Sequence, residues 1–421
     1  MINELFKFIS NSVSPYHTVA TAKSILTECG YEELYEADEW ELSDGGKYFV
    51  TRNGTSIIAF RAKKDATGFM IVASHSDSPS FRLKITPELS GAYTRLEVEK
   101  YGGMIYYSWL DRPLSLAGRA VIKTENGIET RLVNIDRDIA VIPSLAIHMN
   151  RSVNDGYKFN PATDLLPVIG SSAAGGSIMK EFAGFLGVCE EDIISHDVFL
   201  YNREEGRVIG AKGEYILSPR LDDLECVYAS LKAFVLANDS KAIPVFAVFD
   251  NEEVGSETKQ GAASTFLSDV LSRISGEKYK EMLASSFMVS ADNAHAKHPN
   301  HPELSDADNA PLINGGIVIK WNANQKYATD GVSDAVFKAI CERSGAKVQS
   351  YYNRADMLGG STLGSISNTR VSIPTVDIGL PQLAMHSAAE TAGVEDVLHL
   401  VKALTEFFET SIKKQGEKII F

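Results

Sequence analysis

Residues 243–256 read IPVFAVFDNEEVGS, an apolar run that ends in two adjacent glutamates. The run has the length of one buried strand, and no charged side chain interrupts it before Asp250. Two carboxylates held close together raise each other's pKa unless a cation lies between them. We therefore predict a buried strand that delivers Glu252 and Glu253 to a site where a cation binds. Solvated acids at the end of a strand are the simpler alternative.

The chain on both sides of this stretch alternates between helical and strand patterns. SPYHTVATAKSILTECG (14–30) reads as a helix that begins after a Ser cap and ends at a Gly, and LDDLECVYASLKAFVLAN (221–238) as a long amphipathic helix. Apolar strands are predicted in SIIAFRA (56–62), TGFMIVASH (67–75) and SSFMVSADNA (285–294). The alternation predicts an α/β fold, and open α/β sheets carry their sites at the carboxyl ends of the strands.

A different pattern fills the middle of the chain. Alternating stretches punctuated by glycine predict antiparallel strands and hairpins, as in YTRLEVEKYGG (93–103), GRAVIKTENGIETRLVNI (118–135) and GRVIGAKGEYIL (206–217). The glycines and serines of IGSSAAGGS (169–177) predict a flexible loop there.

This change of pattern divides the chain into two predicted domains. The first is a discontinuous α/β domain of residues 1–84 and 216–421. The second is a β-rich domain of residues 85–215, inserted into the first.

The composition is that of a globular protein, and its net negative charge disfavours anionic partners. The chain has 421 residues, of which 44% are hydrophobic and 23% charged, and a formal net charge of −14. No basic cluster stands out against this charge, so we expect neither nucleic acid nor an anionic membrane as a partner. The four cysteines form no CxxC pattern, and neither a signal peptide nor a membrane-spanning run is evident. A cytoplasmic protein is expected.

Candidate metal ligands follow several of the predicted strands. His75 and Asp77 lie two residues apart in HSDSP, so in an extended segment both point the same way, and Asp77 can hold the imidazole N–H that a metal does not use. Asp222 precedes the predicted helix of SPRLDDLE, where it can bridge two ions with support from Asp223. Taken alone, an HxD motif more often contains a core histidine than a metal ligand, and an aspartate at the position of Asp222 is more often a helix cap.

Three further strand ends complete the set. In EEVGS, adjacent residues of an extended chain point opposite ways, so one glutamate can bind metal while the other faces a substrate. Asp292 ends the strand in SADNA, and His386 follows the apolar strand TVDIG and a Pro turn. This mixture of imidazole and carboxylate ligands suits Zn²⁺, Co²⁺ or Mn²⁺, and a free carboxylate beside two such ions can shuttle a proton.

A run of histidines downstream has a different interpretation. His295, His298 and His301 form an HxxHxxH pattern, but prolines at 299 and 302 break the helix that would align the three side chains. We therefore do not expect these residues to bind metal.

Taken together, these motifs resemble the M18 family of metallo-aminopeptidases, the family of aspartyl aminopeptidase. The resemblance runs almost from end to end, through the segments HSDSPSFRLK, IPSLAIHMNR, SPRLDDL, DNEEVGS, SADNAHAKHPNH, IKWNANQKYATD and MHSAAETAG. It implies a mixed-sheet catalytic domain with helices on both faces and an inserted β-rich dimerisation domain. It also implies a dodecamer built from dimers, and peptide substrates with a free N-terminus.

The same resemblance assigns roles to individual residues. It implies two divalent ions, Zn²⁺ first and Co²⁺ or Mn²⁺ as alternatives. One ion would be held by His75 and Asp292 and the other by Glu253 and His386, with Asp222 bridging them. Glu252 would be the general base that takes a proton from the metal-bridging water.

Three more residues are assigned by the resemblance alone. His148, in LAIHMNR, would reach into the site of a neighbouring subunit. Lys320 and Tyr327 would contact the first side chain of the substrate, and a Lys there can pair with Asp or Glu. A buried Lys can equally bind a carboxylate of the protein itself.

Alternative functions remain at this point. A two-metal deacylase or carboxypeptidase would use the same ligands, and a non-catalytic assembly shell would keep the fold. A phosphoesterase would need an Arg or Lys cluster beside the carboxylates, which the sequence does not show. The glycines of GGSTLG (359–364) can line the substrate pocket; a phosphate loop is the weaker interpretation, because the motif order of a P-loop is absent.

Overall fold

The computed structural model describes residues 1–171, 177–357 and 359–421. The chain forms two compact units. The first unit comprises residues 1–77, 206–385 and 390–421, and the second comprises residues 78–205 and 386–389. Most of the predicted flexible loop at 169–177 lies outside the described residues; its first three residues belong to strand β9 (Val168–Ser171).

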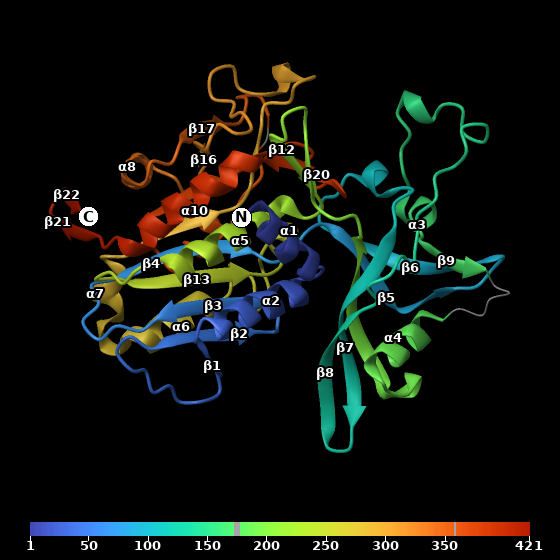
Figure 1. Ribbon diagram of the computed structural model, residues 1–421, viewed down its shortest axis with the longest axis horizontal. Coiled ribbons are helices and arrows are strands. Elements are labelled where there is room, and N and C mark those ends of the chain that lie inside the picture. Colours follow the sequence, from blue (N-terminus) through green and yellow to red (C-terminus); the bar gives the residue numbers. More distant parts are fainter. Residues whose placement is uncertain (172–176, 358) are drawn as a thin grey trace. The chain divides into compact units, whose positions relative to one another are not determined.

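The first unit is built on one large mixed sheet (Figure 1). Among the described residues nine strands form it, in the order β1-β2-β3-β13-β4-β14-β18-β16-β17. Strands β13, β4, β14 and β18 run parallel to one another, whereas β3 and β16 pair antiparallel with their neighbours β13 and β18. The strands are β1 (Glu32–Leu34), β2 (Lys47–Arg52), β3 (Ser56–Arg61), β4 (Phe69–His75), β13 (Ile243–Phe249), β14 (Phe287–Ala291), β16 (Ile317–Trp321), β17 (Val348–Tyr352) and β18 (Thr375–Gly379).

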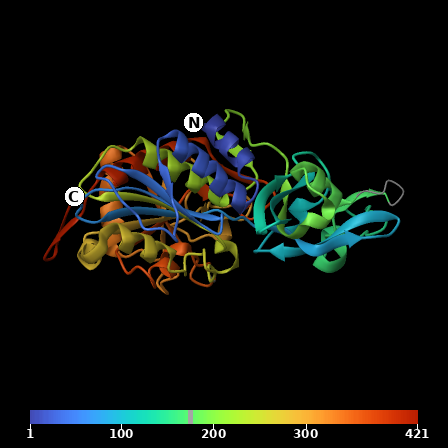
Figure 2. The same ribbon diagram turned by 90° about the horizontal axis from the view of Figure 1, so that it is seen from below.

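Helices cover both faces of this sheet (Figure 2). Successive side chains of a strand point to opposite faces, so Met70 and Val72 of β4 enter one core while Phe69, Ile71 and Ala73 enter the other. The first core is closed by α1 (Ile2–Asn11), α2 (Pro15–Glu28), α5 (Leu221–Leu236), α8 (Gly331–Ser344) and α10 (Val394–Glu409). The second is closed by α6 (Phe266–Ser275), α7 (Tyr279–Leu283) and α9 (Leu363–Ser367). The predicted α/β fold is confirmed.

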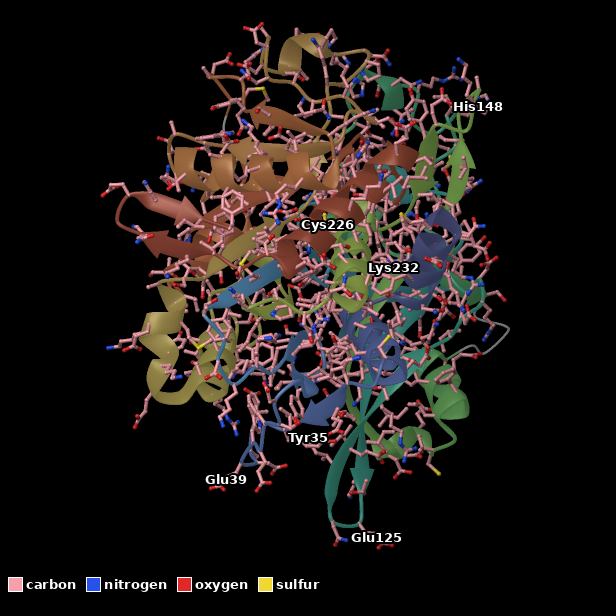
Figure 3. The ribbon with its side chains drawn as sticks, turned by 60° about the vertical axis from the view of Figure 1, so that its left-hand side comes forward. Tyr35, Glu39, Glu125, His148, Cys226 and Lys232 are labelled. Carbon is pink, nitrogen blue, oxygen red and sulfur yellow. The ribbon has the colours of Figure 1, made fainter. Side chains whose placement is uncertain are left out.

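Helix α5 differs from its predicted amphipathic character. Its side chains are buried on almost every side, because the helix lies against the sheet while α1 and α10 pack on it from outside. Cys226 marks this interior position in Figure 3. The helix of residues 14–30 agrees better with its prediction: Ser14 is the N-cap, and its hydroxyl accepts the backbone N–H of His17.

The parallel strands bring their carboxyl ends to one edge of the sheet. Strand β4 ends at His75, β13 ends one residue before Asp250, and β14 ends one residue before Asp292. Polar residues that are far apart in the sequence therefore converge at this edge, which is where parallel sheets place their sites.

The second unit contains an antiparallel sheet. Among the described residues six strands form it, in the order β8-β7-β10-β5-β6-β9, and α4 (Ile178–Leu186) packs on its apolar side. Glu125 lies at the tip of the long β7–β8 hairpin (Figure 3). The remaining bounds are β5 (Ser80–Leu89), β6 (Tyr93–Tyr101), β7 (Leu114–Thr124), β8 (Gly127–Asn134), α3 (Pro161–Asp164) and β10 (Ile193–Asn202).

The segment GRVIGAKGEYIL forms a hairpin in the first unit. Its strands β11 (Arg207–Ile209) and β12 (Tyr215–Ser218) pair with β20 (Glu390–Gly393). The short strands β15 (Ala294–His295) and β19 (Pro381–Gln382) pair in parallel, and β21 (Lys413–Gln415) and β22 (Lys418–Ile420) form a hairpin. Within the described residues, no helix combines the length and apolar character that a membrane crossing needs.

Candidate active site

His75 is the innermost residue of the candidate site. Its ring is buried, and Nδ1 donates to the carbonyl oxygen of Asp77 at 3.0 Å, so Nε2 is the nitrogen that is left for a metal. Nε2 lies 3.4 Å from Oδ1 of Asp222 and 3.8 Å from Oδ1 of Asp292. The imidazole is therefore oriented as a metal-binding histidine is, with one nitrogen fixed by the protein and the other facing carboxylates.

The two aspartates at the start of α5 lie beside this ring. Asp222 and Asp223 are buried, and both have backbone angles that depart from the helix. Oδ2 of Asp223 accepts the backbone N–H of His75 at 3.2 Å, and the backbone N–H of Asp222 donates to Oε2 of Glu390 at 3.0 Å. These bonds fix the position of the aspartates relative to the end of β4.

Together these side chains fit a divalent metal ion. His75, Asp222, Asp223 and Asp292 each offer a ligand atom, and the four atoms lie within 4.8 Å of one another. His75, Glu252 and Glu253 meet the same criterion. The donors are imidazole nitrogen and carboxylate oxygen without thiolate, a set that suits Zn²⁺.

Glu252 and Glu253 stand in a tight turn rather than in the extended segment that the sequence suggested. The turn is a 3-10 helix of Glu252–Val254, entered through Asn251 at φ 64° and left through Gly255 at φ 102°. The carboxylate of Asp77 holds it: Oδ1 accepts the N–H of Glu252 and Oδ2 that of Glu253, each at 3.1 Å. This carboxylate thus fixes the glutamate turn, and its Oδ1 also lies 3.4 Å from Nδ1 of His75.

The charges of the site favour a bound cation. Burial, and then the negative charge of Asp292, raise the pKa of Glu252 to about 8. Burial also raises the pKa of Asp223 well above its usual range. Burial lowers the pKa of His75, but Asp223 and its other acidic neighbours outweigh this effect and raise it well above normal. Without metal, the cluster therefore retains protons that a divalent ion would displace.

Lys320 is buried beside the cluster. Its Nζ donates to the carbonyl oxygen of Asp292 at 2.7 Å and lies 3.4 Å from Oδ2 of the same residue. It also lies 5.3 Å from the ring centre of Tyr327, which is buried. The residues predicted to contact the first side chain of a substrate are thus side by side, and the ammonium group has a protein carboxylate as its partner.

Two predicted site residues belong to the second unit. His386 has Nδ1 hydrogen-bonded to the carbonyl oxygen of Gly103 at 2.8 Å, so its Nε2 is again the nitrogen left for a metal. His148, which is labelled in Figure 3, is exposed in the segment that follows Ile142. Its exposed neighbours include Leu145, Ile147 and Met149.

The histidine run at 295–301 takes no part in the metal clusters. All three side chains are exposed, and His301 pairs with Glu303 at 3.1 Å. Among the described residues, none of the candidate metal groups includes them.

Three polar residues that support the site were not assigned a role of their own from the sequence. Glu390 holds the backbone of Asp222, and Asn293 donates from its amide to the carbonyl of Leu221 at 3.0 Å. Asp223 was expected only to support Asp222, whereas its carboxylate is itself part of the ligand cluster. Their positions in the sequence could have pointed to these residues, because Asp223 and Asn293 directly follow predicted ligands and Glu390 lies four residues after His386.

Comparisons with known proteins show the family to which the chain belongs. Residues 8–408 match the family described as aminopeptidase I zinc metalloprotease (M18). A probable M18 family aminopeptidase 2 from Clostridium acetobutylicum is 47% identical over 425 residues, which cover 96% of this chain and 98% of that protein. A relative of the same description from Pseudomonas paraeruginosa is 39% identical, covering 97% of each.

Solved structures also match this chain. An M18 aminopeptidase from Thermotoga maritima matches with a TM-score of 0.86 at 25% identity, covering 97% of this chain and 95% of that one. The S. cerevisiae mApe1 dodecamer matches with a TM-score of 0.85 at 28% identity, covering 97% and 96%. The family resemblance in the sequence is confirmed, and the chain belongs to the M18 family of zinc aminopeptidases, which are metallo-exopeptidases.

Proposed function

We propose that this aminopeptidase uses two divalent metal ions, with zinc as the first candidate, and Glu252 as general base. His75 and Asp292 would hold one ion, Glu253 and His386 the other, and Asp222 both. The observation that carries the proposal is the placement of Glu252 in one turn with Glu253, beside a buried cluster of His75 and aspartates. A turn of this kind supplies one carboxylate as a ligand and keeps its neighbour as a base.

When bound, the two ions would lower the pKa of a water molecule and polarise the scissile carbonyl. The carboxylate of Glu252 would take the proton from that water and pass it to the leaving amine. Cations beside Glu252 lower its pKa from the value of about 8 in the metal-free protein, so the carboxylate is ionised and ready to accept the proton. Asp77 keeps it in place through the backbone of the turn.

The oligomeric state and the role of His148 are part of the same proposal. The S. cerevisiae relative is described as a dodecamer, and we propose the same assembly here, with the β-rich second unit as the dimerisation unit. The exposed position of His148, among apolar side chains, is suited to an interface. From there it would reach the site of a neighbouring subunit and stabilise the tetrahedral intermediate.

Specificity for the first residue depends on Lys320. An acidic first side chain would pair with the ammonium group. However, Nζ already contacts a carbonyl and a carboxylate oxygen of Asp292. An acidic substrate therefore has to share Lys320 with a metal ligand, and a preference for Asp or Glu stays a prediction.

The test is a panel of aminoacyl p-nitroanilides with Asp, Glu, Leu, Lys and acetylated Leu, given to Zn²⁺-loaded protein and to Glu252→Gln. We expect cleavage of unblocked substrates by the wild type alone, with metal content unchanged in the variant. Cleavage of the acetylated substrate alone would favour a deacylase. Near-normal rates of Glu252→Gln would exclude Glu252 as the base.

A further inference from the structure

A polar recess lies on the first unit, next to the glutamate turn. Its volume is about 840 Å³, and Gly255, the residue at which the turn ends, forms part of its wall. The other lining residues come from separate segments of the chain. These are Arg52 and residues within 257–265, 324–326 and 361–370.

The recess carries a local excess of positive charge in a chain of net charge −14. Lys259, Lys326 and Arg370 line it and are exposed, and the structure describes no ion pair for any of the three. Glu257 is the one acidic residue among the described lining residues. The fourth cation, Arg52, is neutralised by carboxylates outside the recess, those of Glu36 and Asp269.

One of these cations is already oriented for a ligand. The Nε of Arg370 donates to the carbonyl oxygen of Ala263 at 2.8 Å, which fixes the plane of the guanidinium group against the wall of the recess. The structure describes no other hydrogen bond of this side chain. A guanidinium held through Nε keeps two amino groups for a carboxylate.

The walls of the recess are joined to the catalytic turn. Thr258 and Gln260 both donate from their side chains to Oδ1 of Asn251, at 2.8 Å each, and Asn251 directly precedes Glu252. On the opposite wall, Ser365 donates to the carbonyl of Lys326 at 3.1 Å. These bonds tie the backbone on both sides of Lys259, and the backbone of Lys326, to neighbouring segments, and the first two also link the recess to the glutamate turn.

An exopeptidase needs a closed pocket for the first residue and an open path for the rest of the peptide. Lys320 and Tyr327, the residues predicted to contact the first side chain, are buried. The recess, in contrast, is open to solvent beyond the glutamate turn. A recess that adjoins the glutamate turn at Gly255 is suited to the chain that follows the scissile bond.

We propose that this recess binds carboxylate groups of the peptide on the carboxyl side of the scissile bond, through Lys259, Lys326 and Arg370. The enzyme then selects peptides by acidic groups after the first residue, and not only by the first residue itself. This inference rests on the proposed aminopeptidase function. The carboxylate has two sources, an acidic side chain or the free C-terminus of a short peptide, and the substrates of the test separate them.

The experiment compares four tetrapeptides that share the first residue which the p-nitroanilide panel favours. The following three residues are Gly-Ser-Gly with an amidated end, Gly-Ser-Gly with a free carboxylate, Asp-Glu-Gly amide, and Lys-Arg-Gly amide. Release of the first residue gives kcat and KM for the wild type and for Lys259→Gln, Lys326→Gln, Arg370→Gln and their triple combination. A control triple variant, Lys280→Gln, Lys402→Gln and Lys418→Gln, removes the same charge from exposed lysines outside the recess.

We expect the Asp-Glu-Gly peptide to have the lowest KM. Each single variant should raise that KM about two- to fivefold and the triple variant about tenfold or more, as removal of exposed ion pairs does. The control variant should leave it unchanged, and high salt should reduce the difference between the acidic and neutral peptides. If only the free-carboxylate peptide responds, the C-terminus is the group that is bound.

Equal KM values for the amidated neutral, acidic and basic peptides, with no gain from the free carboxylate, would overturn the inference. So would an equal loss in the recess and control variants, which would show an effect of net charge alone. The p-nitroanilides lack these residues, so their cleavage should be the same in every recess variant. Failure of the wild type on the p-nitroanilides would instead count against the proposed function.

Discussion

Nζ of Lys320 lies 3.4 Å from Oδ2 of Asp292 and donates to the carbonyl oxygen of the same residue at 2.7 Å. Lys320 is buried, so the loss of Asp292 as a partner would leave a poorly solvated charge. The lysine therefore fixes a predicted metal ligand through both its side chain and its backbone.

We expect Lys320→Met to lower kcat/KM for acidic and neutral first residues alike. The physical reason is the loss of a partner that orients a metal ligand, which commonly costs about 10- to 100-fold in metal affinity or activity. The measurement is the p-nitroanilide panel with metal content determined in parallel, and Lys338→Met on the surface of α8 is the control. A loss confined to Asp and Glu substrates would show that Lys320 binds the first side chain of the substrate.

Asp77→Asn should impair catalysis while the protein stays folded. The carboxylate of Asp77 accepts two backbone N–H groups of the glutamate turn, whereas an amide would direct its own N–H₂ at one of them. We expect kcat to fall about 10-fold or more, with KM changed less. Steady-state kinetics and thermal unfolding of Asp77→Asn check this, with the exposed Asp65→Asn as control; unchanged kcat would show that the turn holds its geometry without Asp77.

The metal-free protein should lose stability as pH rises. The pKa of Glu252 is raised from 4.5 to about 8 on folding. Between these values the folded state binds more protons than the unfolded state, so the free energy of unfolding falls with increasing pH. The raised pKa of His75 acts in the same direction.

Urea unfolding of the metal-free protein at several pH values from about 5 to about 8 measures this slope. Glu252→Gln should reduce the slope, because the amide does not titrate. Saturating Zn²⁺ should reduce it as well, since the ion displaces the retained protons. Equal slopes in the metal-free wild type and the variant would mean that Glu252 does not hold its proton in the folded state.

His148→Ala should lower turnover without releasing metal, because the proposed role of this histidine is in the site of a neighbouring subunit. Mixing tests the role directly. Co-expression of His148→Ala with Glu252→Gln under different tags gives mixed oligomers, some of whose sites combine an intact Glu252 with an intact His148 from a neighbour. Activity above that of either variant alone supports action across subunits, whereas a loss of metal in His148→Ala would contradict it.

The sequence predicts the α/β architecture because each buried strand is a short apolar run that ends in a polar cluster. The same pattern made His75, Asp222, Glu253 and Asp292 candidate metal ligands, because each lies near the end of a strand or the start of a helix. To predict that these side chains converge, one needs the order of the strands in the sheet, because parallel neighbours such as β4 and β13 are distant in the sequence.

Other features could not be read from the sequence because they depend on tertiary contacts. The glutamates appeared to continue an extended chain, but Asp77 holds their backbone in a 3-10 turn. Helix α5 appeared amphipathic, but its polar residues near the start face the metal cluster and its remaining faces are covered by other helices. The basic recess combines residues from four segments, none of which is basic enough to be noticed alone.

The position of β13 also constrains how the chain can be synthesised and folded. This strand lies between β3 and β4, although it is made more than 160 residues after β4. At about 5–20 residues per second, β3 and β4 wait about ten to thirty-five seconds on the ribosome before the strand that joins them emerges. During this time both present unpaired apolar edges. A chaperone, or the prompt folding of the intervening β-rich unit, would keep these two strands from pairing wrongly during that time.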